Sequence, residues 1–196
     1  MKKIALALIA AASAVGALST AHAEDLKPYV GVSVIGSDHK YSLPNDTSGG
    51  DRKSTEYGGK IYGGVMLNNN YGVELGYTDF GKSSYGYAVN GVNGNIDSHA
   101  KSYYIAGKAQ YPVNEQFNVF GKLGVAHNKN DVGVSGLAAA YGSGDSSRTS
   151  LYAGLGAEYA FTQKVSAVME YEYYGKNDID QGRRKGAISL GAKFAF

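Results

Sequence analysis

Eight short segments alternate between apolar side chains and small or polar ones, and this period constrains the fold more than any other feature. They are the residue ranges 29–35, 56–67, 71–80, 99–111, 117–128, 150–159, 165–173 and 188–196. Successive side chains of a β-strand point to opposite faces, so alternation with a period of two predicts strands. We therefore expect an all-β protein with eight strands.

The polar face of these segments is unusual for a sheet in water. It carries glycine, small polar residues and only one or two charges per segment. A soluble β-sandwich also alternates, but its outer face usually carries more charge. The narrow interior of an eight-stranded barrel instead favours small residues beside a few long charged ones. Strands of about ten residues, tilted by about 45°, also match the apolar band of roughly 25 Å in an outer-membrane barrel.

The sequence therefore predicts an eight-stranded antiparallel up-and-down transmembrane β-barrel. Aromatic residues gather at the ends of the apolar faces, as in the girdles of such barrels. These residues are Tyr71, Tyr77, Tyr103, Tyr111, Phe117, Tyr159, Phe194 and Phe196.

The connections between the segments alternate between short and long. The short ones are residues 68–70, 112–116 and 162–164, and the long polar ones are 36–55, 81–98, 129–147 and 175–184. Outer-membrane barrels have short turns on the periplasmic side and long loops outside the cell. We therefore expect all four long connections outside the cell and both termini in the periplasm.

The N-terminus has the pattern of a secretory signal peptide. Lys2 and Lys3 precede an apolar run over residues 4–18, and Ala21-His22-Ala23 offers a cleavage site of small residues. We predict a cleaved signal peptide at 1–23 and one barrel domain at 24–196.

Residues 24–196 then hold 17 basic and 17 acidic side chains, a balance that disfavours nucleic acid as a partner. Because the chain has no cysteine, disulfides and thiolate metal sites are excluded, and we expect no metal and no cofactor.

Five stretches, in order and at barrel spacing, resemble the transmembrane domain of the OmpA family. They are YGVELGY at 71–77, GKAQYP at 107–112, GLGAEYA at 154–160, MEY at 169–171 and ISLGAKFAF at 188–196. The resemblance implies a small barrel in a Gram-negative outer membrane, in contact with lipid and lipopolysaccharide and inserted by the outer-membrane assembly machinery. It also implies an assembly signal in the last strand, formed by Ile188, Leu190, Phe194 and Phe196. Larger family members continue into a peptidoglycan-binding domain, so we do not expect the cell-wall role to apply to this chain. We expect a monomer.

Charged residues on the inner face suggest what fills the barrel. By parity Lys60, Lys108, Lys122 and Lys193 face Glu56, Glu74, Glu158, Glu170 and Glu172. Buried charges must pair, because an unpaired one costs several kcal/mol. We predict a lumen ion-pair network of Glu74, Lys108, Lys122, Glu158, Glu170 and Lys193, with a direct pair between Glu74 and Lys108.

Such a network is either a plug or a gate. The family resemblance implies a basic residue two positions before the glutamate of the seventh strand, where it competes for the lumen glutamate. This sequence has Val168 there, so we favour a structural plug with surface loops for interaction. A narrow ion-conducting pore stays as the alternative.

An enzyme is the third possibility, since some barrels of this size modify lipids. A hydrolytic site needs a histidine near a serine and a carboxylate. His39, His99 and His127 fall in a loop or at the outer rim, and we expect no catalytic role for them. Arg183, Arg184 and Lys185 open the last strand at the outer rim, where they are either a solvated charge run or a contact for lipopolysaccharide phosphates.

Overall fold

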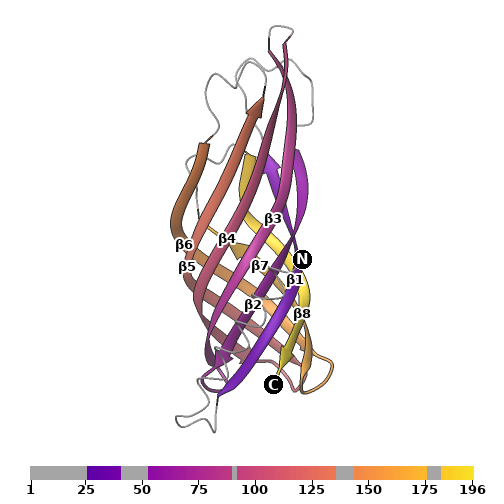
Figure 1. Ribbon diagram of the computed structural model, residues 1–196. Coiled ribbons are helices and arrows are strands. Elements are labelled where there is room, and N and C mark those ends of the chain that lie inside the picture. Colours follow the sequence, from indigo (N-terminus) through magenta and orange to yellow (C-terminus); the bar gives the residue numbers. More distant parts are fainter. Residues whose placement is uncertain (1–25, 41–52, 90–91, 136–143, 176–181) are drawn as a thin grey trace.

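The computed structural model describes residues 26–40, 53–89, 92–135, 144–175 and 182–196, and the expected signal peptide lies outside these ranges. Eight strands form one closed antiparallel barrel in chain order, with β1 paired to β8 (Figure 1). The strands are β1 (Lys27–Lys40), β2 (Lys53–Met66), β3 (Tyr71–Val89), β4 (Val92–Pro112), β5 (Phe117–Ser135), β6 (Gly144–Ala160), β7 (Val165–Tyr173) and β8 (Gly182–Ala195). The predicted fold class is confirmed.

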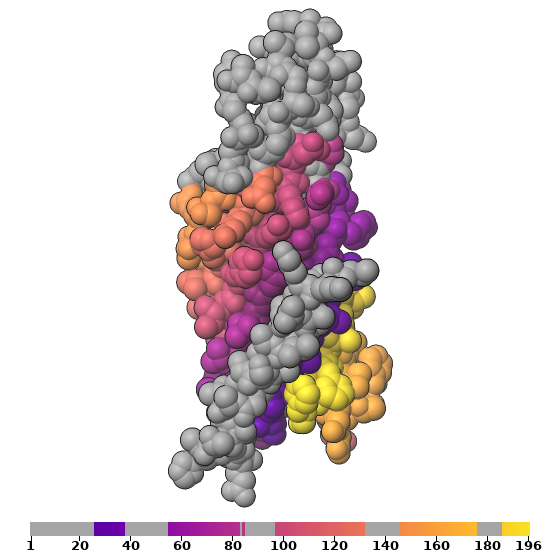
Figure 2. Space-filling model, in the orientation of Figure 1, coloured from indigo at the N-terminus to yellow at the C-terminus, as the bar shows by residue number. Residues whose placement is uncertain are grey.

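Burial is inverted relative to a protein in water. Leu123 and Leu155 on the outer face are 63% and 69% exposed, whereas Lys60 and Glu74 on the inner face are each 1% exposed. Side chains of neighbouring strands run as tilted bands over the outside of the barrel (Figure 2). An apolar exterior around a polar interior is the arrangement that lipid requires of a spanning sheet. Among the described residues, no helix is both long and apolar enough to cross a membrane.

Inner aromatic rings lie over glycines of the adjacent strand. In four cases the ring and the glycine are direct partners in the strand register: Tyr29–Gly64, Tyr62–Gly31, Tyr104–Gly76 and Phe120–Gly156. A Cβ atom added at any of these glycines would collide with the partner ring. The abundance of glycine in the sequence is therefore explained in part by the space that inner rings need against the barrel wall.

Each of the three short turns is closed by one polar side chain near its start. Asn68 Oδ1 accepts hydrogen bonds from the backbone N–H of Asn70 and Tyr71, at 2.9 and 2.8 Å. Asn114 Oδ1 and Thr162 Oγ1 accept the equivalent pairs of bonds in the other two turns. Asparagine and threonine commonly close turns in this way, and the predicted short turns are confirmed.

Two of the predicted long loops are largely strand. β3 and β4 continue as a hairpin as far as the pair Val89 and Val92, through most of the predicted loop 81–98. In the same way β5 extends to Ser135 and β6 begins at Gly144, which shortens the predicted loop 129–147. The β3–β4 extension begins at a register shift beside Gly81, whose φ of 82° favours glycine. In Figure 1 these strands rise beyond the body of the barrel.

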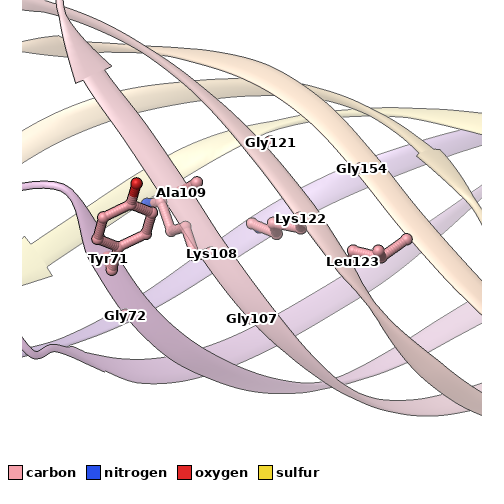
Figure 3. Close-up of a pocket in the computed structure, with 9 residues that line it drawn as sticks. All are labelled: Tyr71, Gly72, Gly107, Lys108, Ala109, Gly121, Lys122, Leu123 and Gly154. Carbon is pink, nitrogen blue, oxygen red and sulfur yellow. The ribbon is translucent and has the colours of Figure 1, made fainter.

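The outer face has a shallow depression where small residues meet. Gly107, Ala109 and Gly121 leave a space of about 430 Å³ between the larger side chains of Tyr71 and Leu123 (Figure 3). It is also bordered by Gly72, Lys108, Lys122 and Gly154. Both lysine side chains are nevertheless almost fully buried in the lumen. The depression is therefore an apolar feature of the outer wall.

The barrel lumen as candidate functional site

Two lysines bridge three glutamates across the lumen. Lys122 Nζ lies 2.6 Å from Glu74 Oε1 and 2.8 Å from Glu170 Oε2. Lys60 Nζ lies 3.0 Å from the same Glu170 oxygen and 2.6 Å from Glu172 Oε1. All five side chains are buried. Since β3 and β7 are four strands apart in a barrel of eight, the chain from Glu74 to Glu170 joins opposite walls.

A second ion-pair cluster is built on Glu158. Lys193 Nζ contacts Glu158 Oε1, and Lys108 Nζ lies 3.7 Å from Glu158 Oε2. That oxygen has no hydrogen-bond partner, so the contact with Lys108 is loose. The Lys108 ammonium instead lies over the rings of Phe120 and Tyr29, at 4.4 and 5.1 Å from their centroids.

The structure thus places all six residues of the predicted network in the lumen, but it corrects the predicted pair of Glu74 and Lys108. In the register Lys108 lies opposite Gly72, and Glu74 lies opposite Ala106, so the two are offset along their strands. Lys108 also lies directly opposite Lys122 on β5. Lys122 takes the Glu74 carboxylate, and repulsion between the two like charges favours the placement of Lys108 near Glu158.

Small residues on neighbouring strands make room for these long side chains. Lys122 and Glu172 both lie opposite Gly154, and Glu170 lies opposite Gly156. Lys60 lies opposite Ser33 on one side and Thr78 on the other. The alternation of large charged and small residues over the inner wall lets charges from separate strands meet near the axis.

Tyrosine hydroxyls complete the hydrogen bonding of the glutamates. Tyr104 and Tyr29 donate to the two oxygens of Glu74, at 2.6 and 2.9 Å. Tyr152 and Tyr174 donate to Glu172 Oε1, at 2.7 and 2.8 Å, and Ser189 donates to Glu172 Oε2 at 2.9 Å. Buried charges are stable only when their remaining lone pairs are satisfied in this way.

The same tyrosines form an aromatic layer beside the ion pairs. The rings of Tyr104 and Tyr152 are stacked, with centroids 4.3 Å apart and an interplanar angle of 14°. Tyr174 meets both rings edge-on and also contacts Phe80. Sequence reasoning missed these residues because it assigned tyrosine to the membrane interfaces. The signal was available, since Tyr104 and Tyr152 lie on inward positions by parity.

The lumen charges balance. Four lysines and four glutamates take part in the described lumen ion pairs: Lys60, Lys108, Lys122, Lys193, Glu74, Glu158, Glu170 and Glu172. Lys60 and Glu172 extend the set chosen from the sequence. The described part of the chain contains no group of three or more side chains suited to holding a metal ion.

The histidines lie away from this network. His99 Nε2 is 2.9 Å from Asp79 Oδ1, and His127 Nδ1 is 3.0 Å from Thr149 Oγ1, both at the rim reached by the long connections. The carboxylate of Asp79 and the hydroxyl of Thr149 thus contact different histidines. The side chain of His39 lies outside the part that the structure describes.

The remaining predicted residues lie on β8. Ile188, Leu190, Phe194 and Phe196 point outward and are 53%, 62%, 42% and 63% exposed. The backbone of Arg183, Arg184 and Lys185 belongs to β8, but their side chains are outside the described set. Their predicted contact with lipopolysaccharide therefore stays a prediction, as does the assembly signal.

Comparisons with known proteins agree with the barrel. The family model for the outer membrane protein beta-barrel domain matches residues 5–196. Outer membrane protein A of Shigella flexneri is 26% identical over 204 residues, covering 100% of this chain and 56% of that protein. Outer membrane protein P5 of Haemophilus influenzae is 29% identical over 191 residues, covering 88% and 52%. The chain thus spans about half the length of these curated relatives.

Solved structures with a similar fold include two bacterial barrels. The attachment invasion locus protein Ail of Yersinia pestis, crystallised with the heparin analogue sucrose octasulfate, has a TM-score of 0.57 at 20% identity, covering 88% of this chain and 99% of that one. OprG of Pseudomonas aeruginosa has a TM-score of 0.54 at 13% identity, covering 88% and 95%. The chain therefore belongs to the outer membrane protein β-barrel domain family and is a protein of the cell outer membrane.

Proposed function

We propose that the protein is a structural barrel whose lumen is closed by ion pairs and whose long connections form an interaction surface outside the cell. The observation that carries the closed lumen is the bridge from Glu74 through Lys122, Glu170 and Lys60 to Glu172. It joins β3, β5, β7 and β2, which lie around the whole barrel. An ion on the axis would have to break at least one of these buried pairs, each of which is costly to separate.

A conductance measurement tests the closed lumen. Purified folded protein in a planar lipid bilayer is expected to add no regular current steps. Tyr104→Ala combined with Tyr152→Ala removes the stacked rings beside the ion pairs and is expected to admit water and produce steps. Regular steps from the unaltered barrel would contradict the plug and support the narrow pore. If such steps were seen, a change in the size of the current steps in the Lys122→Gln variant would indicate that ions pass through the ion-pair network.

The orientation is supported by the contrast between the two rims. The turns at one rim are each four residues long, whereas three of the four connections at the other rim, 41–52, 136–143 and 174–181, have eight residues or more. The fourth, between β3 and β4, is short only because these two strands continue as a hairpin beyond the body of the barrel. Short turns in outer-membrane barrels face the periplasm. The first residues of β1 and the end of β8 pair with each other at the short-turn rim, where the N–H of Phe196 donates to the carbonyl of Pro28.

Trypsin added to intact cells tests this orientation. Cleavage is expected only after basic residues of the long connections, such as Lys40, Arg52 and Lys53. Lys164 lies exposed in the short turn between β6 and β7 and serves as an internal control that should stay intact. After the cells are opened, peptides cut at Lys164 should appear in the mass spectrum. Cleavage at Lys164 in intact cells would overturn the orientation.

The barrel acts in this proposal as a monomer without catalysis. Asp79 contacts His99 and Thr149 contacts His127, so the carboxylate and the hydroxyl lie beside different histidines. This separation supports a non-enzymatic role. The exposed side chains of β8 and the C-terminus bind the assembly machinery in this proposal as the strand inserts; they are Ile188, Leu190, Phe194 and Phe196. A changed lipid A mass spectrum in cells lacking this protein, restored by the intact chain and not by a His99→Ala variant, would favour the enzyme instead.

A further inference from the structure

We propose that Tyr77 and Tyr103, on the outer face of β3 and β4, form an oxidative modification site at which a peroxide-dependent one-electron oxidant joins the two rings as dityrosine. The two tyrosines are direct partners in the strand register. Their ring centroids lie 5.0 Å apart, with an interplanar angle of 46°. This separation is close to that of two rings joined by a single carbon–carbon bond, so coupling needs little movement of either strand. The cross-link would fasten β3 to β4 at the base of their extended hairpin.

The coupling is a balanced two-electron oxidation. Each tyrosine loses one electron and its hydroxyl proton and becomes a phenoxyl radical. The two radicals form one bond between ring carbons next to the hydroxyl groups, and both rings become aromatic again when the hydrogens on these carbons move to the phenolic oxygens. One molecule of hydrogen peroxide takes up the two electrons and two protons through the one-electron oxidant and leaves two molecules of water.

A carboxylate beside the pair can accept one of the released protons. The hydroxyl of Tyr77 donates to Asp79 Oδ2 at 3.5 Å, and the other oxygen of Asp79 is held by His99 and by the N–H of Gly81. A phenol loses an electron more easily when its proton leaves to a nearby base at the same time. The contact with Asp79 therefore favours Tyr77 as the ring that is oxidised first.

The pair lies where the charged rim meets the apolar band. Toward the long connections the next outward register partners are Asp79 and Lys101, and toward the short turns they are Leu75 and Ile105. Tyr103 is 49% exposed. Tyrosine at such a border directs its hydroxyl toward the headgroups and water, where a dissolved oxidant can reach it.

The ring contacts between described tyrosines of the lumen lack this access. Tyr104 and Tyr152 lie closer together, with centroids 4.3 Å apart, but they are only 4% and 0% exposed. Tyr29 and Tyr62 are also buried, and their centroids are 6.5 Å apart. The outer pair combines short distance with exposure, so it is the pair expected to couple.

Controlled oxidation of folded protein in detergent micelles tests the proposal. The probe is tris(bipyridyl)ruthenium(III), a water-soluble one-electron oxidant generated by light and persulfate. After unfolding, trypsin releases Tyr77 in the peptide 61–82 and Tyr103 in the peptide 102–108. We expect these two peptides to appear joined, two hydrogens lighter than their sum and with the fluorescence of dityrosine. Fragmentation should place the bond on Tyr103 and not on the adjacent Tyr104.

Single hydroxyl deletions identify the coupled rings. Tyr77→Phe and Tyr103→Phe should each lower the yield of the joined peptides about tenfold or more, because each removes a pre-positioned reaction partner. Tyr71→Phe is the matched control, since Tyr71 is 62% exposed on the same face of β3 and lies in the same tryptic peptide. This control should keep the full yield. An unchanged yield in either of the first two variants, an equal loss in the control, or cross-linked dimers of the chain as the main product would overturn the proposal.

Intact cells treated with hydrogen peroxide and an added peroxidase test the source of the oxidant. The same joined peptides are expected from the outer membranes of these cells. Their absence would overturn modification from outside the cell. Micelles leave both rims of the barrel open to water, so the chemical coupling itself is tested independently of the orientation proposed above.

Discussion

Replacing Lys122 with alanine is expected to lower the free energy of unfolding by about 3–5 kcal/mol, because the change leaves two buried carboxylates without their shared cation. Lys122 is the central member of the bridge, in contact with Glu74 at 2.6 Å and Glu170 at 2.8 Å. Glu74 would keep only the hydroxyls of Tyr29 and Tyr104 as hydrogen-bond partners. Glu170 would keep Lys60.

Lys108 offers a matched control, since it is the same residue type at the neighbouring position on β4. Its ammonium lies 3.7 Å from Glu158 and otherwise faces aromatic rings, and Glu158 keeps Lys193 when Lys108 is removed. We expect Lys108→Ala to cost about 1–2 kcal/mol, the value of a desolvated cation–π contact. Sequence reasoning alone, with its direct pair of Glu74 and Lys108, would assign the larger cost to Lys108→Ala.

Urea titration in lipid vesicles measures both variants. The chain has no tryptophan, so the folded fraction is best followed by the gel mobility of unheated samples and by circular dichroism. A larger loss for Lys108→Ala than for Lys122→Ala would contradict the observed pairing and return support to the pair expected from the sequence.

The difference between the two lysines shows what strand parity can predict. Strand parity assigned Lys108, Lys122 and Glu74 to the inner face correctly, because the face of a residue depends only on the two-residue repeat of its own strand. Pairing across the lumen depends on strand tilt and on which neighbours leave room, such as Gly154 opposite Lys122. Strand tilt and the room left by neighbours cannot be read from the pattern of one strand. The sequence therefore could not identify Lys122 on β5, 48 residues away, as the partner of Glu74.

Val168 occupies the position where the family resemblance implies a basic residue, and the ion-pair network forms without one. Its side chain is buried in the lumen between Glu158 on β6 and Gly191 on β8. The cations that meet Glu170 come instead from β2 and β5, as Lys60 and Lys122. Because each is held by two carboxylates, neither can leave without exposing a buried charge, and this arrangement favours the plug over the gate.

The extended hairpin of β3 and β4 was missed for a different reason. Residues 81–98 are rich in Gly, Ser, Asn and Asp, which favour loops on average. Tyr85, Tyr87 and Ile96 nevertheless favour strand, and Tyr85 pairs with Ile96 in the register. Outside the apolar band both faces of a strand can be polar, so the alternation that identified the other segments fades while the hydrogen-bonded ladder continues.

Gly76→Ala is expected to destabilise the barrel by about 1–3 kcal/mol, the usual cost of overpacking a filled interior. The added methyl carbon would lie 2.6 Å from the hydroxyl oxygen of Tyr104, whose ring lies over this glycine. Tyr104 cannot move freely, because it donates to Glu74 at 2.6 Å and stacks on Tyr152. The strain therefore falls on the ion-pair network itself.

Gly59→Ala is the matched control, since an added Cβ there meets nothing within 4 Å. It is expected to be neutral or to stabilise by about 0.4–1 kcal/mol, because alanine restricts the unfolded chain more than glycine does. The same urea titration compares Gly76→Ala in the natural background and with Tyr104→Ala. If contact with the ring causes the loss, the cost of Gly76→Ala should largely vanish once Tyr104 is truncated. An equal cost in both backgrounds would mean that the glycine is needed for its backbone, and the packing of Tyr104 against Gly76 would not explain its presence.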